Sequence, residues 1–170
     1  INGVTATPGT YNVQVNSVAK ASGSTATLTF RVMSGTTVVA ATAPVTYTLG
    51  GAVDTVALSL DADSYTIGAP AVATITVKDS SGNAAFDADH ATILSVATGL
   101  SSSLAITKTL FGATSVSTLG GVASVSFNAP SVAAEWTISG TTGAGPVTDI
   151  AKALSASATV DITEGSALAL

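Results

Sequence analysis

The chain has 170 residues, of which 46% are hydrophobic and only 9% are charged, with a net charge of −5 and no cysteine. So few Lys and Arg residues exclude the clustered cations that neutralise nucleic-acid phosphates, and the lack of cysteine excludes disulfides and thiolate chemistry. Ser and Thr interrupt every apolar stretch, so no membrane span is expected. The opening residues have no signal-peptide pattern, and we expect that such a peptide was removed upstream.

The first 50 residues alternate apolar and polar side chains, which predicts β-strands with one dry face. We expect four strands, at residues 10–17, 25–33, 36–42 and 44–50. Four strands form one sheet, and an apolar sheet face needs a second layer. Domain 1–50 is therefore expected to be incomplete. Its second layer could come from an upstream segment, which we favour, from the second domain, or from a neighbouring copy.

The remainder of the chain has the same two-residue period, separated by Gly-rich turns. The clearest strands are expected at residues 55–60, 71–79, 121–130, 135–140 and 155–163. Residues 53–163 have room for seven strands, the usual number for an immunoglobulin-like sandwich, although 84–97 and 146–156 could each form a short helical turn. The prediction is an all-β, antiparallel fold with tandem immunoglobulin-like β-sandwich domains at 1–50 and 53–164, and a tail or linker at 165–170.

Two segments resemble a known family. Residues 56–89 include a strand, a short Asp/Tyr link and a strand ending in "VKDSSGN", and residues 120–142 include a strand ending in "AP" followed by one that begins near Trp136. This pattern is similar to bacterial immunoglobulin-like domains of the invasin and surface-layer type. The resemblance implies a sandwich fold and a place at the cell surface. The acid-rich link before His90 and the stretch 101–116 depart from the pattern.

The one tryptophan, Trp136, is expected in the core, where it would share a strand face with Ile138 and contact Val125 and Phe127 on the preceding strand. The one histidine, His90, lies near Asp87 and Asp89 in sequence, as a Ser-His-Asp catalytic triad would allow. The sequence has no "G-x-S-x-G" nucleophile elbow to support such a triad. We interpret His90 as an exposed loop residue and predict no enzyme activity.

Acidic residues gather between positions 54 and 89 and could bind calcium, which takes about six to eight oxygen ligands. The candidate ligands are Asp61, Asp63, Asp79, Asp87 and Asp89, assisted by an amide such as that of Asn83. No EF-hand pattern is present, and the alternative is that these acids solvate turns and protect sheet edges.

A hydroxyl-rich chain of low charge with no catalytic motif predicts an extracellular structural protein that associates with copies of itself into a surface layer, sheath or filament. An adhesin or stalk module that presents a binding domain is the alternative. A carbohydrate-binding module for a cell-wall or surface glycan is a third, less favoured because the aromatic residues are scattered along the chain.

Overall fold

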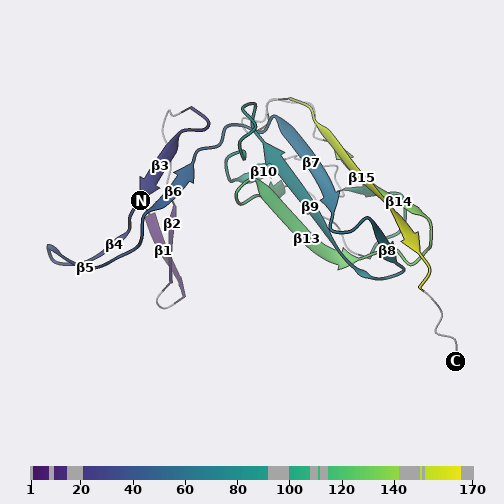
Figure 1. Ribbon diagram of the computed structural model, residues 1–170, viewed down its shortest axis with the longest axis horizontal. Coiled ribbons are helices and arrows are strands. Elements are labelled where there is room, and N and C mark those ends of the chain that lie inside the picture. The colour runs from purple at the N-terminus through teal and green to yellow at the C-terminus, as the bar shows by residue number, and fades with distance from the viewer. Residues whose placement is uncertain are drawn as a thin grey trace. The chain divides into compact units, whose positions relative to one another are not determined.

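The computed structural model describes residues 2–7, 10–14, 21–91, 100–107, 111, 115–141, 150 and 152–165, with the backbone alone for 2–7, 10–14, 89 and 91. The regular elements of these residues are all β-strands, and they include no helix that could cross a membrane. The chain divides into two compact units, Ile1–Leu49 and Gly50–Leu170. Figure 1 shows the strands of both units.

The first unit has six described strands rather than four, and they pair two by two. The pairs are β1 (Asn2–Thr7) with β2 (Thr10–Gln14), β3 (Thr25–Leu28) with β6 (Val45–Thr48), and β4 (Arg31–Ser34) with β5 (Thr37–Ala41). The strand predicted over 25–33 is divided, because Pro44 on the returning strand has no N–H to donate to a ladder. Residues 15–17 of the first predicted strand lie outside the described residues.

Strands β3 to β6 form one two-stranded ribbon, in which residues 24–34 run beside residues 37–49. Between the two strand pairs, Phe30 and Thr42 remain bonded through their backbones, at 2.9 Å from the Thr42 amide to the Phe30 carbonyl. The ribbon turns at Gly35, whose φ of 60° suits the first position of a two-residue hairpin loop. No side chain between Ala21 and Thr48 is buried. This part of the first unit therefore has no core of its own.

The second unit contains two sheets that share a core (Figure 1). One has the order β13-β9-β7, with strands Val122–Asn128, Pro70–Lys78 and Thr55–Leu60. The other has the order β11-β14-β15-β8, with strands Ser101–Ser102, Glu135–Thr141, Ser155–Thr163 and Ser64–Thr66. A small pair joins β10 (Asp89–Ala91) to β12 (Ser115–Ser117). The helical turn considered for 84–97 is wrong in its described part, where β10 forms.

One pairing of named strands departs from the expected antiparallel arrangement: β8 runs parallel to β15. Strand β7 lies at the edge of the first sheet, and after a link of three residues the chain continues as β8 at the edge of the second. Strands β7 and β8 do not pair with each other, so this link is not a hairpin. It transfers the chain between the sheets, and β8 thereby covers part of the edge of β15.

The core confirms the prediction for Trp136, which is fully buried with Ile138 on β14. Its indole meets the rings of Phe127 and Tyr65 edge-on, at centroid distances of 5.6 and 6.4 Å. Phe127 was expected beside Trp136 in the same sheet, and this is wrong: β13 pairs with β9, and Phe127 reaches the indole from the opposite sheet. The aromatic residues thus join the two layers of the sandwich.

Candidate functional site

The two units of the chain differ strongly in net charge. Residues 1–49 include two cations, Lys20 and Arg31, and no acidic residue, a net charge of +2. Residues 50–170 have three lysines against all ten carboxylates, a net charge of −7. Opposite charges of this size on two units of one chain attract between copies as well as within a copy.

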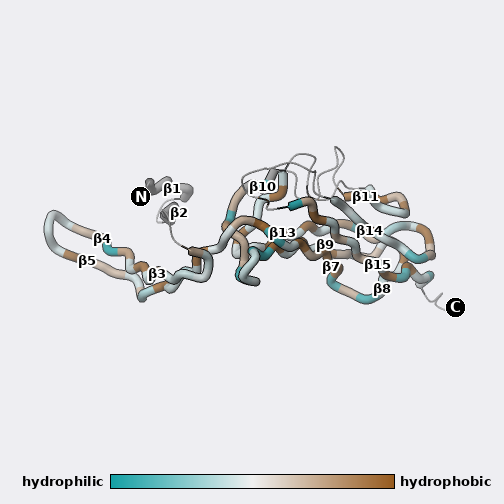
Figure 2. Tube along the Cα trace, turned by 90° about the horizontal axis from the view of Figure 1, so that it is seen from above, coloured by the Kyte–Doolittle hydropathy of each residue, from teal (hydrophilic) through white to brown (hydrophobic). Residues whose placement is uncertain are grey.

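One face of the β4–β5 hairpin combines apolar side chains with a cation. Arg31 pairs with Ala41 and Met33 pairs with Val38, so these four residues, which we call the Arg31 face, share one side. A register shift between Val32 and Met33 leaves Val39 without a cross-strand partner. Met33 is 50% exposed and Val39 is 60% exposed. Hydrophobic residues recur along both strands in Figure 2.

The other side of the ribbon is also apolar. Val32, which is 58% exposed, pairs with Ala40, and beyond the hairpin Phe30, Val45 and Tyr47 are exposed as well. A two-stranded ribbon in water is marginally stable at best, and contiguous exposed apolar surface marks an interaction site in soluble proteins. The ribbon is therefore the strongest candidate for a binding surface among the described residues.

The calcium candidates Asp61 and Asp63 lie in the link between β7 and β8. Asp61 Oδ1 accepts a hydrogen bond of 2.5 Å from the Tyr65 hydroxyl and one of 2.7 Å from the amide of Val72. These bonds, the one from Tyr65 first, hold the pKa of Asp61 below its usual value. Burial, followed by the bond to Asp61, raises the pKa of Tyr65 to about 12. Asp61 therefore stabilises the link between β7 and β8 through these hydrogen bonds. Asp63, in the same link, is exposed.

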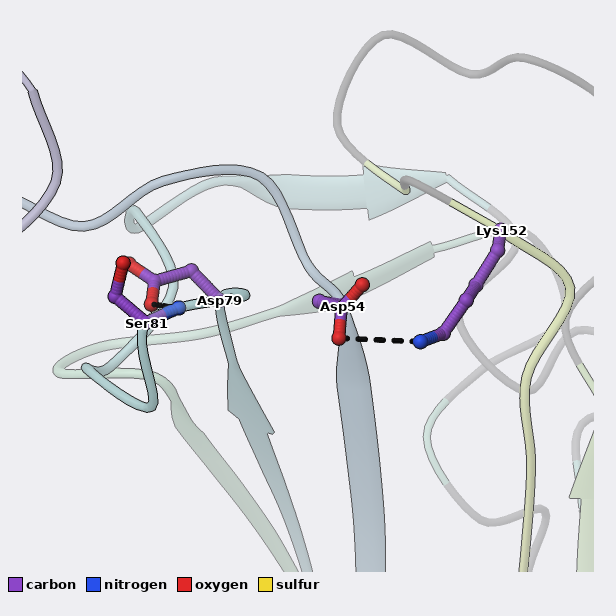
Figure 3. A network of polar contacts seen from close by, with 4 residues as sticks. All are labelled: Asp54, Asp79, Ser81 and Lys152. Atoms are coloured by element: carbon purple, nitrogen blue, oxygen red, sulfur yellow. Dashed lines mark hydrogen bonds and ion pairs between the residues drawn. The ribbon is translucent and has the colours of Figure 1, made fainter.

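Asp79 and Asp87 lie at the other end of β9, where their carboxylates accept hydrogen bonds from backbone amides. Asp79 is buried, and it accepts from Gly51 at 2.8 Å, Ser81 at 2.9 Å and Asn83 at 3.1 Å. Asp87 accepts from Gly121 at 3.2 Å. Figure 3 shows Asp79 turned toward Ser81, and the separate ion pair of 3.1 Å between Asp54 and Lys152.

The structure therefore does not bring the five calcium candidates together. Val72, bonded to Asp61, and Asp79 are seven residues apart on an extended strand, roughly 20 Å at the usual rise. The side chain of Asp89 lies outside the described residues, which contain no group of three or more His, Cys, Asp or Glu residues able to hold a metal. Calcium binding by the acids at a single end of β9 stays a prediction. A lower melting temperature in excess chelator would support it.

His90 is fully buried, so the interpretation of an exposed loop residue is wrong. Its Nε2 lies 3.1 Å from the carbonyl oxygen of Phe86 and 3.1 Å from the hydroxyl of Thr118, and its ring packs against that of Phe86. The burial arises because β10 pairs with β12, which places His90 opposite Val116 inside the second unit. These contacts link β10 to Phe86 before it and to Thr118 after β12.

An aromatic platform for sugars does not form in the described part of the second unit. Trp136, Tyr65 and Phe127 are buried in the core, and none of the other described aromatic rings of this unit is exposed. An open hollow near the start of β15 is lined mainly by hydroxyls, those of Ser101, Ser139, Thr141, Ser155 and Ser157. A hollow without an aromatic ring lacks the stacking surface that the carbohydrate-binding alternative requires.

Two carboxylates that the sequence analysis did not single out oppose each other on the second sheet. Glu135 on β14 is paired with Asp161 on β15, and both are exposed. No ion pair to either carboxylate is present among the described residues. Like charges directly opposite across two strands destabilise a sheet. Only the strand register places these two residues together, since they are far apart in sequence.

No family model matches this chain, and no curated protein is significantly similar to it.

Proposed function

We propose that this chain is a structural, non-catalytic protein of the cell surface whose copies associate into a surface layer, sheath or filament. The observation that carries the proposal is the ribbon of residues 24–49. It exposes apolar side chains on both faces, and none of its residues is buried. Docking on another copy would remove this surface from water.

The strand order of the second unit supports the proposal of an immunoglobulin-like sandwich. The sheet order β13-β9-β7 corresponds to strands E, B and A of such a sandwich, and β11-β14-β15 corresponds to C, F and G. On this assignment the first unit is the other domain of the tandem, and it is incomplete. The resemblance of residues 56–89 and 120–142 to domains of the invasin and surface-layer type implies a place at the cell surface, and this supports an extracellular role.

Sedimentation velocity and electron microscopy of the purified full chain test the proposal, over a range of protein concentrations with and without calcium. We expect association that grows with concentration and gives fibres or lattices. Monomeric rods under every condition would contradict self-assembly and favour the stalk alternative, and retention on a glycan column would favour the carbohydrate-binding alternative.

A matched pair of variants locates the contact. Met33→Lys/Val39→Lys places two charges on the exposed hairpin and should weaken association, because each lysine would have to lose its hydration in the interface. Ser59→Lys/Ser80→Lys adds the same charge at exposed positions on β7 and in the turn after β9, outside β14 and β15, and should have a smaller effect. Equal effects of the two pairs would show that net charge, not the ribbon, governs association.

A further inference from the structure

We infer, on the basis of the proposed self-assembly, that the copies join head to tail: the Arg31 face of one copy docks on the outer face of β14 and β15 of another copy, at Glu135 and Asp161. The occupant of the unpartnered ribbon is thus the acidic second unit of a second copy. The inference goes beyond self-association because it names the two surfaces and the charges that meet.

Arg31, the cation of the Arg31 face, has no carboxylate partner in its own unit. Arg31 is exposed, and residues 1–49 contain no Asp or Glu that could pair with it. Met33 and Val38 extend the Arg31 face beside the guanidinium. When these apolar side chains are covered, water is excluded around the cation, and its attraction to a carboxylate increases as the local dielectric falls.

The outer face of β14 and β15 has two carboxylates that lack a cationic partner among the described residues. Glu135 and Asp161 repel each other across β14 and β15, and among the described residues neither forms an ion pair. The described cations of this unit do not relieve the repulsion, since Lys152 pairs with Asp54 and Lys78 ends β9 in the other sheet. A guanidinium has several donors in one plane and can bond two carboxylates at once. An incoming Arg31 would turn a repulsive pair into an attractive group of three.

The surface beside the two acids is suited to a flat ribbon. Next to Glu135 and Asp161 on the same strands, Thr137 pairs with Thr159, and their hydroxyls are hydrogen-bonded at 2.8 Å. Each hydroxyl thereby has a partner within the sheet, which lowers the cost of covering this surface. The threonine methyl groups offer apolar contact to Met33 and Val38.

Charge also opposes the other arrangements. Contact between two ribbons would bring Arg31 near Arg31, and contact between two second units would bring together surfaces of net charge −7 each. Only the contact between unlike units is attractive. Contacts between two different surfaces, repeated from copy to copy, give rings or open filaments rather than closed symmetric dimers.

Charge reversal in the full chain tests this inference by sedimentation velocity at low and at high salt. Arg31→Glu and the double variant Glu135→Lys/Asp161→Lys should each weaken association at least about tenfold, because each makes the contact repulsive. The double variant retains a like-charged pair on the sheet, so its fold should be affected little. An equal mixture of the two variants should associate again, because the carboxylate introduced in one variant then meets the lysines introduced in the other.

Salt and a control substitution complete the experiment. High salt should weaken association of the unaltered chain by screening the contact, whereas non-specific association of chains of net charge −5 would strengthen when their repulsion is screened. Lys78→Glu changes the net charge as Arg31→Glu does and should leave association unchanged. Association of the unaltered chain with no effect of charge reversal, or no restoration on mixing, would overturn the head-to-tail contact while self-assembly stands. No association at any salt would overturn both.

Discussion

The indole of Trp136 donates a hydrogen bond of 2.8 Å from Nε1 to the hydroxyl of Ser102, and that hydroxyl donates in turn to the carbonyl of Leu104 at 2.6 Å. Ser102 lies on β11, next to β14 in the sheet. The largest fully buried side chain of the described core thus has its single polar atom satisfied by the neighbouring strand.

Trp136→Ala should lower the free energy of unfolding by about 3–5 kcal/mol, because it leaves a large cavity between the two sheets. Ser102→Ala should cost about 1–2 kcal/mol, since the buried indole N–H then lacks an acceptor. Urea denaturation of the full chain measures both. Ser59→Ala, an exposed serine on β7, is the control, and an equal cost for the two serine substitutions would show that the bond to the indole contributes nothing.

The pair Asp61 and Tyr65 should make stability fall in acid. The pKa of Asp61 lies below its ordinary value of 3.8, because Tyr65 and then Val72 donate to the carboxylate. The ionised form therefore stabilises the folded state: its contribution is fully present above about pH 3.8 and is lost as the pH falls through the lower folded pKa. Asp61→Asn should be less stable than the unaltered chain at neutral pH, and the gap should narrow in acid. Asp63→Asn, an exposed neighbour, should show no gap at either pH.

Tyr65 should make stability fall in alkali as well. Burial, and then the bond to Asp61, raises the pKa of Tyr65 from 10 to about 12. The unfolded chain ionises first, so the contribution is fully present below about pH 10 and is lost as the pH rises toward 12. Tyr65→Phe should remove this loss in denaturation curves measured across that interval. A loss of the same size in Tyr65→Phe would assign it to other groups.

Asp79 should be the most costly of the calcium candidates to remove, whether or not calcium binds. Asp79→Ala deprives three backbone amides of their acceptor, those of Gly51, Ser81 and Asn83, and should cost on the order of 3 kcal/mol. Asp79→Asn retains one acceptor oxygen and should cost less. Ser80→Ala, an exposed residue of the same turn, is the control. A cost for Asp79→Ala that matches the control would mean that solvent satisfies these amides.

Gly120 and Gly121 form a matched pair at the turn before β13. Both have a positive φ, 62° and 71°, so a side chain at either position costs on the order of 1 kcal/mol. A Cβ at Gly120 meets nothing within 4 Å, whereas one at Gly121 would lie 2.7 Å from the carbonyl oxygen of Val77. Gly121→Ala should therefore lower the melting temperature clearly more than Gly120→Ala. Equal shifts would mean that β9 and the turn separate easily.

Local periodicity in the sequence determined much of the strand content of this protein. Strands at 55–60 and 155–163 were predicted with the bounds that β7 and β15 have in the structure, and the burial of Trp136 was predicted from its alternation with Glu135 and Thr137. These features depend on side chains two residues apart, because successive residues of a strand face opposite sides wherever that strand pairs.

Only the tertiary structure decided which strands meet. Phe127 faces Trp136 from the other sheet, His90 is buried by the pairing of β10 with β12, and Glu135 lies opposite Asp161 on the next strand. Each relationship joins residues more than eight positions apart, through loops whose sequence does not specify the partner strand. The acids expected to gather at one calcium site were separated for the same reason, since β9 runs the length of the sandwich between Asp61 and Asp79. Alternation sets which side of a strand is dry, whereas strand order and register set which residues share a surface.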